Sequence, residues 1–262
     1  MQSNIEALKA TAERLSRNIT ADDVELTEDG CIIHLSDGTW SAALDESKTV
    51  IGIVFWAGDP TAYDPGLKAD HPDCVNGLAV SLTGSATVKY QQNAFLFDLV
   101  EGYSTVSDWL TENTDCTSLL VDINDETQRN SRLGYSQTLS MEVFNSSVDV
   151  SYALGVMEYV AQYRMDVPAP ESSSDWYMPS LKELTLLFGG DVDPNEPLKT
   201  GSVKAPVNSS IRNIPGATEL RSTHLSSCEK DTNNCIALNM DYGDVENANK
   251  ETGKNARLII AF

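Results

Sequence analysis

Basic residues are scarce in this sequence, and histidine is scarcer still. The 262 residues include 18 Lys and Arg against 39 Asp and Glu, with three His, for a formal net charge of -21 at pH 7. A polyanion is repelled by nucleic-acid phosphates and by anionic lipid surfaces. We therefore expect no nucleic-acid partner. We interpret the acidity as that of a soluble surface protein, with binding of a cation or a basic partner as the alternative.

Long apolar runs are also missing. No stretch approaches the ~18 consecutive apolar residues that a membrane-spanning helix requires, so we expect no membrane span. The first residues, Met1–Asn4, are polar and lead into a helical pattern, and no signal peptide is visible. The chain is therefore either cytosolic or exported by a leader outside this sequence.

Motifs of catalysis and cofactor binding are absent as well. The sequence has no P-loop, no dinucleotide-binding glycine fingerprint and no Gly-x-Ser-x-Gly around a nucleophile. A zinc ion at His71 and Cys74 would need two more ligands, and no other Cys/His pair has ligand spacing. We expect no enzyme, no cofactor and no metal.

Cysteine is sparse and odd in number, with residues at 31, 74, 116, 228 and 235. Cys228 and Cys235 bracket a polar loop and could form a short disulfide, and Cys74 could pair with Cys116. Cys31 is interpreted as a small buried hydrophobic residue. Two disulfides and one free thiol would suit an exported protein, whereas five reduced cysteines would suit a cytosolic one.

The pattern of apolar residues predicts an α+β protein in two parts. Residues 1–46 form a helix and a three-stranded β-meander, and residues 47–262 form the main domain. Strands are expected at 50–56, 77–82, 236–240 and 256–262, and helices near 106–110, 150–167 and 179–190. The segments 57–76, 83–149 and 191–217 otherwise have loop composition. We also expect 50–56 to pair antiparallel with 256–262, which would bring the ends of the domain together.

Three segments of the main domain resemble bacterial C-type-lectin-like domains. They are Asp175-Trp176-Tyr177-Met178-Pro179-Ser180-Leu181-Lys182-Glu183-Leu184, Gly77-Leu78-Ala79-Val80-Ser81-Leu82, and a tail from Arg221 through Leu238–Val245 to Arg257–Phe262. The family occurs in surface and fimbria-associated proteins of Bacteroides-type bacteria. It is similar to the variable proteins of diversity-generating retroelements, whose C-terminal surface is mutated. The resemblance implies a C-type-lectin-like fold and a location at the cell surface or in secreted form.

The resemblance departs from the family's pattern in ways that bear on ligands. Arg221 stands where an aromatic residue is usual, and Cys235 falls near a common Trp position. Asp193-Pro194-Asn195 is similar to the Glu-Pro-Asn triplet of calcium-dependent lectins, but the companion Trp-Asn-Asp is absent. Calcium-dependent sugar binding is therefore not our expectation.

The tail has a composition typical of adaptable recognition, because Asn both donates and accepts hydrogen bonds and Tyr offers rigid amphipathic area. The alternative is a solvated hairpin whose Asn residues serve turns. The candidate ligand-binding residues are Thr223, His224, Ser226, Glu229, Asp231, Asn233, Asn234, Asn239, Asp241, Tyr242, Asp244, Glu246, Asn247, Asn249 and Lys250.

From these features we expect a surface-exposed adhesion or ligand-binding protein that recognises an extracellular protein or glycan without covalent chemistry. One alternative is a structural fimbrial or envelope subunit whose partners are other such subunits. Another is an enzyme of the formylglycine-generating type, which has a lectin-like fold and two cysteines near its C-terminus. Cys228 and Cys235 do not have the spacing of that enzyme.

Overall fold

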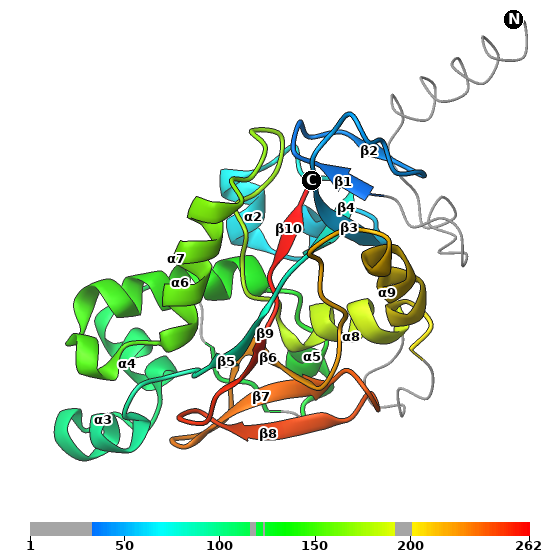
Figure 1. Cartoon of the computed structure of the whole chain (residues 1–262). Helices are drawn as coiled ribbons and strands as arrows, with labels where there is room; N and C mark the ends of the chain where they lie inside the picture. The colour runs from blue at the N-terminus through cyan, green and yellow to red at the C-terminus, as the bar shows by residue number, and fades with distance from the viewer. Residues whose placement is uncertain (1–32, 116–118, 123, 192–200) are drawn as a thin grey trace, which may run out of the picture.

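The computed structural model describes residues 33–115, 119–122, 124–191 and 201–262. Within them the chain alternates short strands and helices (Figure 1). The strands are β1 (Ile33–Leu35), β2 (Trp40–Ser41), β3 (Val50–Ala57), β4 (Gly77–Ser81), β5 (Ser85–Val88), β6 (Thr223–Glu229), β7 (Asn234–Asn239), β8 (Val245–Asn249), β9 (Lys254–Ala256) and β10 (Ile259–Ala261). The helices are η2 (Pro60–Ala62), α2 (Pro65–Asp70), α3 (Ala94–Glu101), α4 (Val106–Asn113), α5 (Glu126–Arg129), α6 (Gly134–Ser147), η3 (Val150–Tyr152), α7 (Gly155–Asp166), α8 (Leu181–Gly189) and α9 (Lys204–Arg212).

The first sheet has the strand order β10-β4-β3-β1-β2, with all neighbours antiparallel. β3 and β4 consist almost entirely of buried residues, which is what a strand covered on both faces requires. The predicted pairing of 50–56 with 256–262 is wrong, because β4 lies between them: Val80 is opposite both Ile53 and Ile259. The two segments do share a sheet, but they are not neighbours in it.

The second sheet has the order β5-β9-β6-β7-β8 and is antiparallel except between β6 and β9. The segment that was predicted as one terminal strand is divided between the two sheets, since β9 belongs to the second and β10 to the first. Arg257 lies at this crossing point. Its buried guanidinium donates hydrogen bonds to the carbonyl oxygens of Ser81 and Thr218, which fixes the crossing to both neighbouring segments.

Helix α8 packs against strands of both sheets, namely β3, β6 and β7. It begins with a capping box: the Ser180 hydroxyl accepts from the Glu183 backbone N–H, and the Glu183 carboxylate accepts from the Ser180 backbone N–H. The helix predicted at 179–190 is thereby confirmed. Trp176 is fully buried just before the helix, and its indole donates to the Val167 carbonyl oxygen at 2.8 Å.

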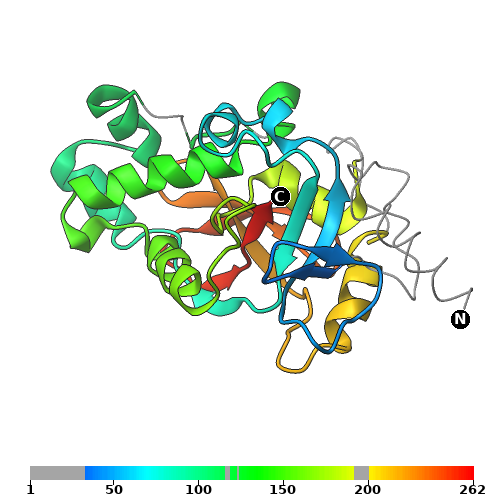
Figure 2. The ribbon, with the colours of Figure 1, turned by 90° about the horizontal axis from the view of Figure 1, so that it is seen from above.

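Helices α6 and α7 cover one side of the molecule, away from the β1–β2 hairpin (Figure 2). The sequence predicted α4 and α7, but not α6 or α9. Helix α6 is rich in Ser, Thr and Gln, and α9 contains Pro206 in its first turn, where a missing backbone N–H costs no helical hydrogen bond.

The described part of the N-terminal segment extends the first sheet, because β1 pairs with β3 as well as with β2. The predicted N-terminal helix and the first strand of the predicted meander fall within residues 1–32, outside the described residues, so the domain boundary at 46/47 stays a prediction. Among the described helices, none is long and apolar enough to cross a membrane.

Candidate functional site

The tail residues singled out in the sequence lie on β6, β7, β8 and the turns that join them, at the lower edge of Figure 1. β8 is the edge strand of the second sheet, so one of its sides is open to solvent. Because side chains alternate between the two faces of a sheet, the predicted residues separate into buried and exposed sets.

Four of the predicted ligand contacts are buried and serve the fold: His224, Ser226, Glu229 and Lys250. Lys250 donates to the Glu229 carboxylate, whose two oxygens also accept the backbone N–H groups of Val106 and Ser107 at 2.9 Å each. Glu229 therefore neutralises Lys250 and caps the N-terminus of α4 at the same time. These side chains cannot reach a ligand, and their assignment to the binding face is corrected.

The other two buried residues are Ser226 and His224, and both belong to the interior of the sheet. The Ser226 hydroxyl donates to the Ile236 carbonyl oxygen at 2.7 Å, which links β6 to β7. Burial lowers the pKa of His224 to about 3, with further contributions from the positive charges of Arg257 and Lys204. His224 is therefore neutral at physiological pH.

A row of polar side chains crosses three strands at the partly exposed end of the second sheet. The Glu246 carboxylate on β8 accepts hydrogen bonds from the Thr223 hydroxyl on β6, at 2.9 Å, and from the Asn239 amide on β7, at 2.8 Å. Each side chain is half-buried. Both oxygens of the Glu246 carboxylate are thus engaged within the sheet. We interpret the row as a cross-strand clamp, meaning that its hydrogen bonds hold β6, β7 and β8 together.

Several Asn and Asp side chains of the tail form hydrogen bonds within the turns, as expected for a solvated hairpin whose Asn residues serve turns. The Asp231 carboxylate accepts from the backbone of Asn233 and from the backbone and side chain of Asn234 in the β6–β7 turn. After β8, the side-chain oxygen of Asn249 accepts from the Glu251 backbone N–H and the Thr252 hydroxyl, and the Asp241 carboxylate accepts from the Ser222 backbone N–H. These side chains shape the turns.

The predicted residues that remain exposed without a side-chain partner in the described structure are Tyr242, Asp244, Asn233 and Asn247. Tyr242 is 73% exposed at the tip of the β7–β8 turn. Asn247 lies on the edge strand β8. Tyr242 and Asp244 share the β7–β8 turn, whereas Asn233 lies in the β6–β7 turn at the opposite end of the strands. A rigid aromatic ring and a carboxylate in one exposed turn can contact a polar ligand.

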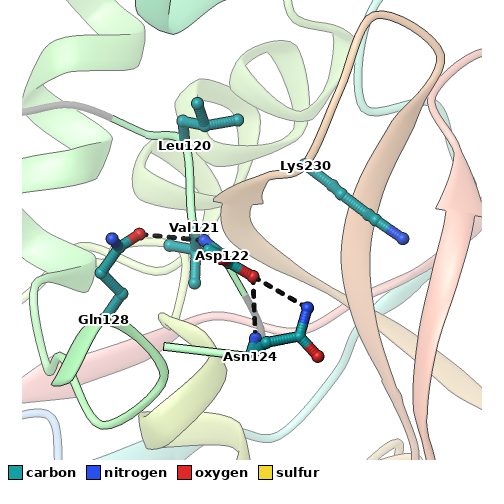
Figure 3. A pocket seen from close by; sticks show the side chains of 6 residues that line it. All are labelled: Leu120, Val121, Asp122, Asn124, Gln128 and Lys230. Carbon is teal, nitrogen blue, oxygen red and sulfur yellow. Dashed lines mark hydrogen bonds between the residues drawn. The ribbon is translucent and has the colours of Figure 1, made fainter. Parts of the chain in front are cut away.

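Next to the β6–β7 turn, the structure forms a hollow of about 310 Å³ that sequence reasoning missed (Figure 3). Its lining residues are Leu120, Val121, Asp122, Asn124, Gln128 and Lys230. Backbone hydrogen bonds between Val121 and Glu229 and between Glu229 and Leu119 hold the two segments together.

The polar groups of this hollow are largely engaged with one another. The Asp122 carboxylate accepts from the backbone and side-chain amides of Asn124. The side-chain oxygen of Gln128 accepts from the Asp122 backbone N–H. The Lys230 ammonium points away from these groups in Figure 3. In the sequence, residues 120–128 stand out only as a polar stretch. The hollow could not be predicted from them, because Lys230, which completes its lining, lies about a hundred residues away.

A second hollow, of about 350 Å³, lies between the β1–β2 hairpin and the segment after α2. It includes His71 and Cys74, the residues weighed for zinc. His71 Nε2 lies 3.1 Å from the Tyr135 hydroxyl, which donates to Asp70 at 3.2 Å. Among the described residues, no group of three His, Cys, Asp or Glu side chains is arranged to hold a metal ion.

The expected disulfides are not formed. Cys74, Cys228 and Cys235 are free, buried thiols, and Cys31 and Cys116 lie outside the described residues. Cys235 is opposite Glu229 in the β6–β7 pair, so the preceding residue, Cys228, points to the other face of the hairpin. Burial raises the pKa of Cys235 to about 12 and that of Cys74 to about 11, and it raises the pKa of Cys228 as well. Such thiols are protonated and poor nucleophiles.

One protein and one solved structure similar to this chain come from Bacteroides ovatus. No family model matches the chain. Over 210 residues, 70% of this chain, the sequence is 24% identical to a putative fimbrium tip subunit, Fim1C. A crystal structure of a fimbrial protein from the same species superposes on 89% of this chain with a TM-score of 0.69 and 19% identity. The chain therefore has the same fold as part of this crystallised fimbrial protein.

Both similar proteins are much longer than this chain. The match covers 35% of the length of the tip subunit and 48% of the crystallised fimbrial protein. At 19% identity the structural likeness shows a common fold, while function has to be argued from the chain's own surfaces.

Proposed function

We propose that this chain is a non-enzymatic subunit of a surface fimbria, or part of one, and that it contacts other fimbrial or envelope subunits without covalent chemistry. The observation that supports this proposal is the agreement of the two comparisons, one by sequence and one by fold, on fimbrial proteins. The described cysteines fit it too, since they are buried and protonated and offer no enzymatic nucleophile.

Fractionation of the cells that make the protein tests the proposal. Fimbriae sheared from these cells and purified by density should contain the chain, as detected by an antibody against the intact protein. Intact cells should also bind this antibody at their surface. A chain found only in the soluble cytosol, with none in the fimbrial fraction, would contradict the proposal.

A second, finer function is recognition of an extracellular protein or glycan by the exposed tail residues on a C-type-lectin-like scaffold. Tyr242, Asp244 and Asn247 favour it, because they are exposed and have no side-chain partner in the described structure. A glycan array probed with the wild type and with Tyr242→Ala tests this function. The matched control is Tyr63→Ala, which removes an exposed tyrosine outside the tail.

Binding that falls with Tyr242→Ala and not with Tyr63→Ala would support ligand recognition by the tail. Repeating the array with a chelator would reveal any dependence on calcium, which we do not expect.

Genetic diversification of the tail is a further proposal. A reverse transcriptase gene and a template repeat beside the coding sequence would support it, and their absence would end it.

A further inference from the structure

Helix α3 exposes an apolar face to solvent. Phe95, Leu96, Leu99 and Val100, together the α3 face, have exposed fractions between 45% and 69%. Their spacing of one and four residues places them side by side on one side of the helix. The opposite side is anchored in the core by Phe97, which stacks against Tyr103 and packs edge-on against Phe144.

The neighbouring 3-10 helix η3 packs against the buried side of α3. The ring centroids of Phe97 and Tyr152 are 5.5 Å apart, and the Asn93 amide donates to the Ser151 carbonyl oxygen at 2.9 Å. These contacts fix α3 to the rest of the chain and leave the α3 face uncovered. Single exposed apolar residues are ordinary, but four side by side on one helix mark a candidate interaction site.

Carboxylates predominate around the α3 face in the sequence, and the exposed Lys89 lies just before this stretch. No Lys or Arg occurs between residues 90 and 128, whereas eight Asp and Glu do, and residues 133–163 also contain no Lys or Arg. Asp98 and Glu101 lie on α3 itself, and Asp149 immediately precedes η3. Glu251, in the turn after β8, accepts a hydrogen bond from the Phe95 backbone N–H at 3.3 Å. The apolar surface is therefore rimmed by carboxylates.

We propose that the α3 face is a docking surface for a protein partner that presents an apolar segment flanked by Lys or Arg. The apolar residues supply the affinity, and the carboxylate rim selects a basic partner. A second copy of this chain would bring like charges together, and an anionic membrane would be repelled for the same reason. Through Glu251 the surface adjoins the turn after β8, but it does not include the exposed tail residues Tyr242, Asp244 and Asn247.

Two designed amphipathic helical peptides with the same leucines, one with Lys and one with Glu at its polar positions, test this surface on the full chain. The Lys peptide should bind the wild type by fluorescence anisotropy or calorimetry, and the Glu peptide should not. Leu99→Gln, which keeps helix propensity and charge, should weaken the Lys peptide about tenfold or more. Met165→Gln, an exposed residue of α7 outside the face, is the matched control and should leave binding unchanged.

The carboxylate rim is tested by the double variant Asp98→Asn/Glu101→Gln, which should weaken the Lys peptide and reduce the salt dependence of its binding. Equal binding of both peptides, or equal affinity of the wild type and Leu99→Gln, would overturn the proposal. Concentration-dependent self-association that Leu99→Gln abolishes would assign the face to a second copy, and binding to vesicles of anionic lipid would assign it to a membrane. Either result would contradict the proposal that the α3 face binds a basic protein partner.

Discussion

The interior of the second sheet and the face of helix α3 use side chains in opposite ways. In the sheet, Glu229 and Lys250 are charged and fully buried, and they satisfy each other and the start of α4. On α3, Leu99 and Phe95 are apolar, and more than half of the surface of each is exposed to solvent in the described structure.

The difference teaches that polarity alone does not locate a functional surface. Burial of a charge is tolerated where its partners are complete, and it then fixes structure rather than contacting a ligand. Exposure of several apolar side chains has no such compensation within the chain. It therefore points to something outside the chain that covers them.

The largest effect on stability is expected from removing the buried cation of the second sheet, Lys250. Lys250→Met leaves the Glu229 carboxylate buried without its counter-charge, and we expect a loss of about 3–5 kcal/mol in the free energy of unfolding, measured with urea. The double variant Lys250→Met/Glu229→Gln should recover part of that loss, because no charge then remains unpaired. If Lys250→Met were as stable as the wild type, the buried pair would not hold the sheet to α4.

The interior of the sheet should also respond to acid through His224. Its pKa of about 3 in the folded state lies below the usual 6.5, so the unfolded state binds the proton more readily. By linkage, this contribution to stability is complete above pH ~6.5 and is lost as the pH falls toward about 3. The free energy of unfolding of His224→Gln should therefore depend less on pH than that of the wild type over this window.

A second buried histidine provides the control for that measurement. Burial also lowers the pKa of His34, to about 4, so His34→Gln should reduce the pH dependence in the same direction. The double variant should be flatter than either single one. Glu183, whose pKa burial raises to about 7, acts in the opposite sense but is common to all these proteins and cancels in the differences. A His224→Gln variant with the wild-type slope would contradict the prediction.

At the boundary between interior and surface, the row across β6, β7 and β8 should have an intermediate effect. Glu246→Ala removes the acceptor of two side-chain hydrogen bonds, and we expect a loss of about 1 kcal/mol in thermal or urea unfolding. Asn247→Ala changes the next residue, which is exposed on the other side of β8, and should stay within about 0.5 kcal/mol of the wild type. Equal losses in the two variants would show that Glu246 does not clamp the strands.

The sequence predicted those elements whose local signals agree with their tertiary surroundings. Helix α8 carries its own start signal in Ser180 and Glu183, and β3 and β4 are continuous apolar runs. Helix α6 was missed because residues such as Thr138 and Ser140 look like loop residues, yet both are buried and donate to backbone carbonyl oxygens one turn earlier. Its helical form depends on packing against α2 and β6, which lie far away in the sequence.

The candidate site could be predicted only in part, for a related reason. Of the strands β6, β7 and β8, only β7 was predicted. Without β6 the sequence could not show that Glu229 would be buried, and Glu229 was therefore placed among the ligand contacts. The hollow at Lys230 depends on the pairing of Leu120 with Glu229, a contact between distant segments. The α3 face was missed because residues 94–101 lie within 83–149, which was predicted to be loop apart from the helix near 106–110.

The smallest expected effect is the one that sharpens the comparison most. Leu99→Gln should change the free energy of unfolding by no more than about 0.5 kcal/mol, because the side chain is 69% exposed and loses little packing. A loss above about 1 kcal/mol would mean that Leu99 is covered by part of the chain itself, and the α3 face would then belong to the core. An unchanged stability, together with weaker binding of the Lys peptide, separates the two roles: the buried charges of the sheet maintain the fold, and the exposed leucine serves a partner.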